Sequence, residues 1–140
     1  WSGGLCLADV LGVLGREDVY LACKWDVFQS YSIAAYNLYL NYDGKGNKYG
    51  TTSVYATQSD TVAISSFASL DDEKNLHIIA INKTNEAQNT SFEIENGIYS
   101  NGVVYGFDKN TSDSGNLKFG TLRVLSFFSI AVIIQRFPTP

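Results

Sequence analysis

Hydrophobic positions in the first forty residues recur at helical spacing, with one continuous apolar run between two such segments. In residues 3–15 leucine or alanine returns every three residues, which predicts a helix that ends near Gly15. Residues 18–25 are almost continuously apolar, as is typical of a strand buried on both faces of a parallel sheet. Ser30 is a candidate N-cap for a second helix over residues 30–41. A helix, a buried strand and a helix indicate the end of an α/β domain.

From residue 43 onward the pattern changes to short alternating or apolar runs separated by turn signals. A glycine-rich loop over residues 43–50 opens this part, and its Asp-Gly step is a strong turn signal. Short strands at such intervals are typical of a sandwich. We therefore predict a mainly β fold, with an antiparallel β-sandwich after a helix-strand-helix segment. The predicted strands cover residues 52–57, 62–68, 76–82, 90–95, 103–107, 117–119 and 122–134.

Charge and composition exclude several classes of partner. The net charge is −4, and the ten Lys and Arg residues are scattered, so the sequence predicts no nucleic-acid binding. The most apolar stretch, residues 122–134, contains Arg123 and is too short to span a bilayer, so we expect no membrane segment. The chain begins without Met or a basic leader, which indicates a fragment or a processed product.

Metal, cofactor and catalytic signals are weak. Cys6 and Cys23 both lie in apolar runs, which favours two buried free thiols over a disulfide. With a single histidine, His77, they cannot complete a zinc site, and a lone strand histidine is typical of a structural residue. Asp26 follows the predicted buried strand, but one carboxylate is not the pair that a glycosidase requires. We therefore expect no catalytic residue, no metal and no cofactor in this chain.

Several segments together resemble one enzyme family. They are Leu-Gly-Val-Leu-Gly-Arg-Glu at 11–17, Trp25, residues 39–54 with their Asn-Tyr-Asp-Gly sequence, residues 78–83 and residues 125–133. In this order they resemble the C-terminal part of family 44 glycoside hydrolases, which are endoglucanases and xyloglucanases. The resemblance covers nearly the whole chain.

The resemblance implies a (β/α)8 barrel joined to a β-sandwich, in a secreted parent enzyme that hydrolyses β-1,4-glucan with retention. Residues 1–42 would be the C-terminal remnant of the barrel and a connecting helix, and residues 43–140 the sandwich domain. Both catalytic glutamates of the family would precede Trp1, so the chain alone is expected to be inactive. Trp1 and Trp25 are the candidate substrate-binding residues, because their rings could stack on glucosyl units.

Two alternatives remain open. The chain could be a carbohydrate-binding module, which would need exposed, coplanar aromatic rings, or a structural interaction domain without a ligand. The implied partner is a β-glucan, reached through the parent enzyme. Apolar surface on the first helix and strand would also favour self-association or contact with the missing barrel portion. The candidate rings for a binding module are Tyr55, Phe67, Phe92, Tyr99, Tyr105 and Phe107.

Overall fold

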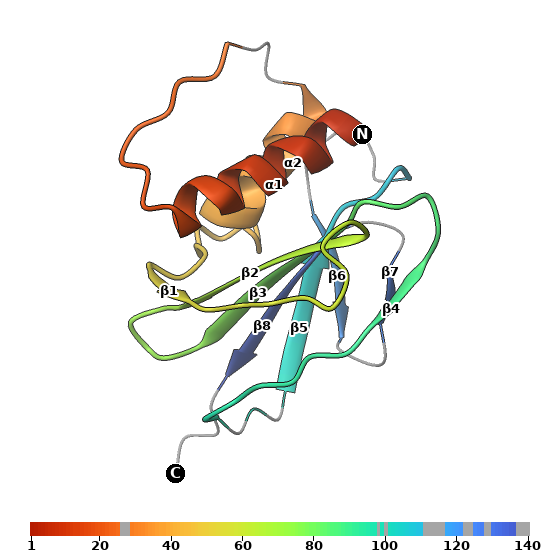
Figure 1. Ribbon diagram of the computed structural model, residues 1–140. Helices are drawn as coiled ribbons and strands as arrows, with labels where there is room; N and C mark the ends of the chain where they lie inside the picture. The colour runs from red at the N-terminus through yellow and green to blue at the C-terminus, as the bar shows by residue number, and fades with distance from the viewer. Residues whose placement is uncertain are drawn as a thin grey trace.

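Two helices form one layer over an antiparallel sheet (Figure 1). The computed structural model describes residues 1–25, 29–97, 99, 101–110, 117–121, 125–127 and 130–136. Helix α1 spans Ser2–Arg16 and helix α2 spans Ser30–Leu40, which confirms both predicted helices. Ser30 is the first residue of α2 and not its cap, because Gln29 occupies the N-cap position.

The main sheet has six antiparallel strands, in the order β1-β2-β3-β8-β5-β6, and a two-stranded sheet pairs β4 with β7. Strands distant in the sequence therefore become neighbours: β8 pairs with β3 on one side and with β5 on the other. The predominance of antiparallel strands confirms the coarse fold class. The strands are β1 Thr52–Val54, β2 Ile64–Leu70, β3 Leu76–Asn82, β4 Gln88–Thr90, β5 Asn101–Gly106, β6 Lys118–Thr121, β7 Leu125–Phe127 and β8 Ile130–Arg136.

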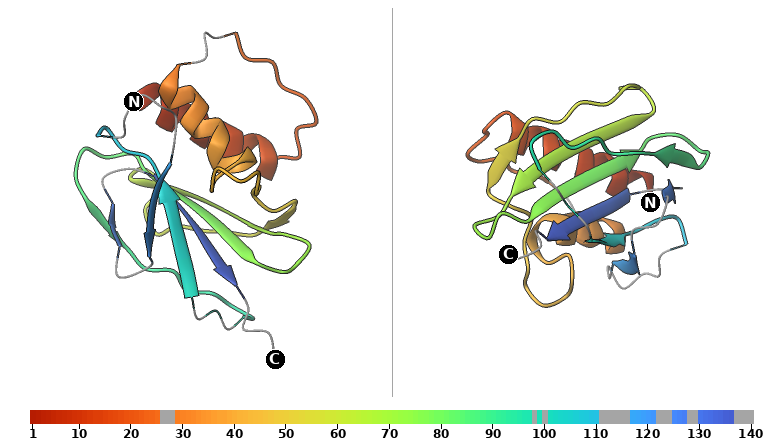
Figure 2. Two further views of the ribbon diagram at one scale, coloured as in Figure 1. Left: turned by 180° about the vertical axis from the view of Figure 1, so that it is seen from behind. Right: turned by 90° about the horizontal axis from the view of Figure 1, so that it is seen from below.

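Strand β3 lies at the centre of the core and is buried along its whole length. Its side chains alternate between the two faces of the sheet. Ile79 and Ile81 face the helices and pack in one cluster with residues of α1 and α2, whereas Leu76 and Ile78 pack on the opposite face. Phe92 and Ile94 cover part of that opposite face. Figure 2 shows the helices behind the sheet when the molecule is seen from below.

Residues 18–25 depart most from the prediction. They form no strand, and Tyr20, Leu21 and Trp25 are 100%, 75% and 103% exposed. The prediction of a buried strand here is wrong, because a strand needs a neighbouring strand to satisfy its backbone groups, and no described strand pairs with this segment. Both cysteines are free, as predicted, but they are exposed and not buried.

Other predicted strands are confirmed in part. Of the strand predicted over residues 90–95, only Thr90 lies in a strand, as the last residue of β4. Phe92 and Ile94 nevertheless pack against the core, as the alternating pattern predicts. The single long strand predicted over residues 122–134 is wrong. Two strands, β7 and β8, occupy this part of the chain and belong to different sheets. The sandwich itself and the division at residue 42 stay predictions. No described helix has the length and apolarity that a membrane crossing requires.

Candidate functional site

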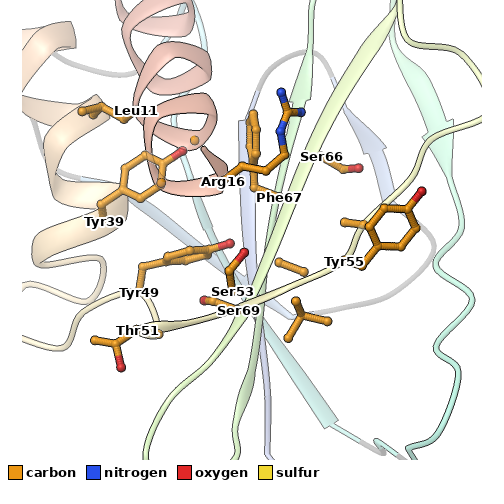
Figure 3. A pocket seen from close by; sticks show the side chains of 16 residues that line it. Leu11, Arg16, Tyr39, Tyr49, Thr51, Ser53, Tyr55, Ser66, Phe67 and Ser69 are labelled. Atoms are coloured by element: carbon orange, nitrogen blue, oxygen red, sulfur yellow. The ribbon is translucent and has the colours of Figure 1, made fainter. Parts of the chain in front are cut away.

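A groove of about 680 Å³ lies between the C-terminal half of α1 and strands β1 and β2, of which β1 is the edge strand. Its volume falls in the range of small-molecule sites. Tyr39 and Tyr49 lie on one side of it and Tyr55 on the other (Figure 3). Strand β1 has three residues and its neighbour β2 has seven, so Ser66 and Phe67 of β2 line the groove beyond the part of β2 that pairs with β1.

Two tyrosines form a fixed aromatic wall. The rings of Tyr39 and Tyr49 meet edge to face, with centroids 5.3 Å apart and an interplanar angle of 68°. Tyr39 Oη donates a hydrogen bond of 2.7 Å to the carbonyl oxygen of Ala8, which ties α2 to α1. Burial raises the pKa of both phenols, and for Tyr39 electrostatic repulsion from the ionised forms of Tyr49 and Asp9 adds to the rise. Both rings therefore stay neutral over the physiological pH range.

Close backbone approach shapes the inner end of the groove. Phe67 of β2 packs against Gly12 of α1, where an added Cβ would stand 2.3 Å from the phenylalanine ring. Glycine at this position lets the helix approach the sheet. By contrast, a Cβ added at Gly15, which also lines the groove, would meet nothing within 4 Å. The groove is thus closed at Gly12 and open at Gly15.

Behind the aromatic wall lies His77, which is fully buried. Its ring meets Tyr42 and Tyr49 edge-on, with centroids 5.7 Å and 5.9 Å away. Its Nε2 lies 3.3 Å from Asp71 Oδ2, while Nδ1 is buried without a hydrogen-bond partner in the described part of the chain. Burial lowers the pKa of His77 and outweighs the opposing effect of Asp71. The histidine is therefore a neutral core residue.

Two further buried hydroxyls stand at this wall. Tyr49 Oη and Ser69 Oγ both lack a hydrogen bond of ordinary geometry within the described residues. The Ser69 hydroxyl is near enough to oppose the rise in the pKa of Tyr49, but burial prevails. Both residues line the groove, with these two oxygen atoms buried.

The mouth of the groove is polar around one exposed ring. Tyr55 is 91% exposed and follows β1 directly. Ser53, in β1, presents an exposed hydroxyl two residues before Tyr55, whereas exposed Thr51 lines the groove on the side of Tyr49 (Figure 3). Arg16 is the last residue of α1, and its Nε donates a hydrogen bond of 2.8 Å to Glu17 Oε1. Because the cation is already paired, the mouth has little net charge.

Four aspartates of the described chain stabilise turns by accepting hydrogen bonds from nearby backbone amides. Asp43 accepts hydrogen bonds from the Lys45 and Asn47 amides, and Asp60 accepts from the Val62 and Ala63 amides. Asp71 and Asp108 accept in the same way from the backbone amides of Asn75 and Asn110.

These bonds work against acid catalysis. Hydrogen bonds from backbone amides lower the pKa of Asp60. In Asp43 and Asp71 the hydrogen bonds outweigh burial, which alone would raise the pKa. A glycosidase acid needs the opposite shift. Among the described residues, no group of three His, Cys, Asp or Glu side chains is placed to hold a metal ion.

The predicted substrate-binding tryptophans lie outside the groove. Trp1 is the N-cap of α1, where its carbonyl oxygen accepts from the Gly4 and Leu5 amides, and its side chain is 37% exposed. Trp25 is fully exposed on the segment between the helices. Asp26 falls outside the described residues. The roles of both tryptophans stay predictions.

The candidate rings of a binding module are mostly internal. Phe67 and Phe107 are buried, and Phe92, Tyr99 and Tyr105 are partly buried. Tyr55 alone among the six is freely exposed. Tyr39 and Tyr49, which form the groove wall, lie in the 39–54 segment of the family resemblance, but nothing in the sequence of that segment indicates that the two rings meet.

The chain is similar to several glycoside hydrolases, although no protein-family model matches it. It is 45% identical over 117 residues to beta-mannanase/endoglucanase A of Caldicellulosiruptor saccharolyticus, and 42% identical over 118 residues to endoglucanase A of Paenibacillus lautus. These matches cover 80% of this chain but 9% and 17% of the two relatives.

Its structure is similar to that of a Paenibacillus polymyxa xyloglucanase from glycoside hydrolase family 44, solved with xyloglucan. The TM-score is 0.82 at 37% sequence identity. The match covers 97% of this chain and 29% of that enzyme.

Proposed function

We propose that this chain works as part of a family 44 glycoside hydrolase. Its similarity to these enzymes confirms the resemblance of its sequence to their C-terminal part. In this proposal the chain is a non-catalytic portion of an enzyme that hydrolyses β-1,4-glucan. It packs on the catalytic portion and stabilises it. The observation that carries the proposal is a match over nearly all of this chain to less than a third of a xyloglucanase.

The carboxylates support a non-catalytic role. Retaining glycosidases need two carboxyl groups facing each other across the scissile bond, one of them with a raised pKa. Asp43, Asp60 and Asp71 instead have lowered pKa values and are bonded within their own turns. The proposal therefore places both catalytic carboxylates in other parts of the parent enzyme.

An exposed apolar segment supports a partner within the parent. Residues 19–25, on the segment that follows α1, present Val19, Tyr20, Leu21 and Trp25 to solvent. Several large apolar side chains exposed on one short segment are typical of an interface. We propose that this segment contacts the catalytic portion, and that residues 1–42 belong with the barrel that the family resemblance implies.

The first test is reducing-sugar release from xyloglucan and carboxymethylcellulose by the purified 140-residue chain. The Paenibacillus polymyxa xyloglucanase serves as the positive control. We expect release no higher than from a heat-killed sample. Release above that level would contradict the non-catalytic role and would direct attention to Asp26.

The second test addresses the exposed segment. Leu21→Asp should reduce binding of 8-anilinonaphthalene-1-sulfonate and self-association without loss of helix content, because Leu21 is 75% exposed and lies outside both helices. Thr61→Asp, at another exposed position, is the matched control and should leave both unchanged. Equal dye binding in wild type and Leu21→Asp would count against an interface at this segment.

A further inference from the structure

The groove beside α1 has the chemistry of a sugar-binding site. A pyranose ring has two apolar faces and a circumference of hydroxyl groups. It therefore requires a flat apolar surface for its faces and hydrogen-bonding groups around its edge. Tyr55 offers the flat surface at the mouth, Ser53 offers a hydroxyl two residues before it, and Thr51 offers another on the Tyr49 side of the groove (Figure 3).

The groove walls are fixed before any ligand arrives. The Tyr39–Tyr49 pair is held by the hydrogen bond from Tyr39 to Ala8, and Phe67 is held against Gly12. Rigid walls lower the entropy that binding would otherwise cost. Such a site differs from a flat platform of several exposed rings, which this chain lacks among its described aromatic candidates.

The charge of the mouth selects for a neutral ligand. Arg16 is paired with Glu17 at 2.8 Å, so an anionic ligand would have to displace an existing partner. The exposed residues Thr51 and Ser53, which also line the groove, are uncharged. A neutral polyhydroxylated molecule therefore fits better than a phosphate or an acid.

We infer that the groove between α1 and strands β1 and β2 binds a short, soluble β-1,4-linked glucan chain, with one glucosyl ring stacked on Tyr55. The choice of β-1,4-glucan rests on the proposed function, whereas the preference for a neutral sugar rests on the groove alone. In this arrangement the chain holds the polysaccharide as well as stabilising its parent.

Two substitution pairs test the site on the 140-residue chain. Gly15→Phe places a ring in the open part of the groove, where an added Cβ meets nothing, and Gly3→Phe does the same on α1 away from the groove. Tyr55→Ala removes the proposed stacking ring, and Tyr20→Ala removes an equally exposed ring elsewhere. Circular dichroism confirms that each variant is folded.

Cellotetraose, a xyloglucan heptasaccharide and maltotetraose are titrated by calorimetry and by ¹⁵N-resolved NMR. We expect one of the β-1,4-linked sugars to bind, with shifts at residues 49–56 and 66–69. Gly15→Phe and Tyr55→Ala should weaken binding at least tenfold, while Gly3→Phe and Tyr20→Ala leave it within twofold of wild type.

Absence of binding by both β-1,4-linked sugars overturns the inference, as does binding that both groove variants leave unchanged. Tighter binding of maltotetraose would overturn the assignment to β-1,4-glucan. None of these outcomes depends on hydrolysis, so the non-catalytic role in a glucan hydrolase is tested separately.

Discussion

Two alanine substitutions in the same helix should change stability in opposite directions. In Gly12→Ala the new Cβ would stand 2.3, 2.4 and 2.6 Å from three ring atoms of Phe67. Carbon atoms in normal contact are about 3.5–4.0 Å apart, so ring and helix must separate by about 1 Å. Phe67 belongs to the buried core cluster, so moving the ring aside disrupts its packing.

The magnitude follows from two opposing contributions. Overpacking of a core costs about 1–3 kcal/mol, and a separation this large belongs near the upper end. Alanine in a helix gains about 1 kcal/mol over glycine. The net loss for Gly12→Ala is therefore about 2 kcal/mol. Gly15→Ala, where the methyl group meets open space, should gain roughly 0.5–1 kcal/mol.

Urea denaturation followed by far-ultraviolet circular dichroism measures both changes. With an m-value of roughly 1–3 kcal/mol/M, the midpoints of the two variants should differ by about 1 M or more. In a Phe67→Leu background the cost of Gly12→Ala should shrink, because the ring atoms that it meets are gone. Stabilisation of the chain by Gly12→Ala to the same extent as by Gly15→Ala would refute the packing of α1 on β2.

The remaining predictions concern titration and exposure. Because burial lowers the pKa of His77 below 6.5, the unfolded chain binds the proton more tightly, so the free energy of unfolding should fall as the pH drops below 6.5. His77→Gln should flatten this slope in urea titrations, and an unchanged slope would contradict the assignment. Burial raises the pKa of Tyr39 and Tyr49, so stability should be lost above pH 10 as the unfolded phenols ionise, with a delayed rise in absorbance at 295 nm. Cys6 and Cys23 should both react with Ellman's reagent without denaturant, and fewer than two equivalents would argue against their exposure.

Local pattern predicted the elements whose burial depends on near neighbours. Strand β3 matches its predicted bounds, because residues 76–82 are apolar on both faces and lie between helices and a covering segment. Helices α1 and α2 also match, because their apolar faces meet each other and the sheet. In these cases the sequence pattern and the packing require the same conformation.

Pattern failed where burial depends on a partner. Residues 18–25 have the composition of a buried strand, yet no strand in the described part of the chain pairs with them and they stay exposed. The groove was also not predictable, because α1, the loop after α2 and strands β1 and β2 meet only in the folded chain. Similarly, the burial of His77 follows from the strand register and from two tyrosines more than twenty residues away.

The claim that this chain is a stabilising, non-catalytic portion of a glucan hydrolase is tested most directly by exchanging it for the matching segment of a solved relative. The segment of the Paenibacillus polymyxa xyloglucanase that matches this chain is deleted, and in a second protein it is replaced by these 140 residues. Xyloglucan hydrolysis is then measured for both, beside the intact enzyme. We predict that the deletion abolishes hydrolysis and that the chimera restores it to within about tenfold of the intact enzyme, a loss of about 1.4 kcal/mol. A deletion variant that keeps full activity, or a folded chimera that has none, would contradict the account.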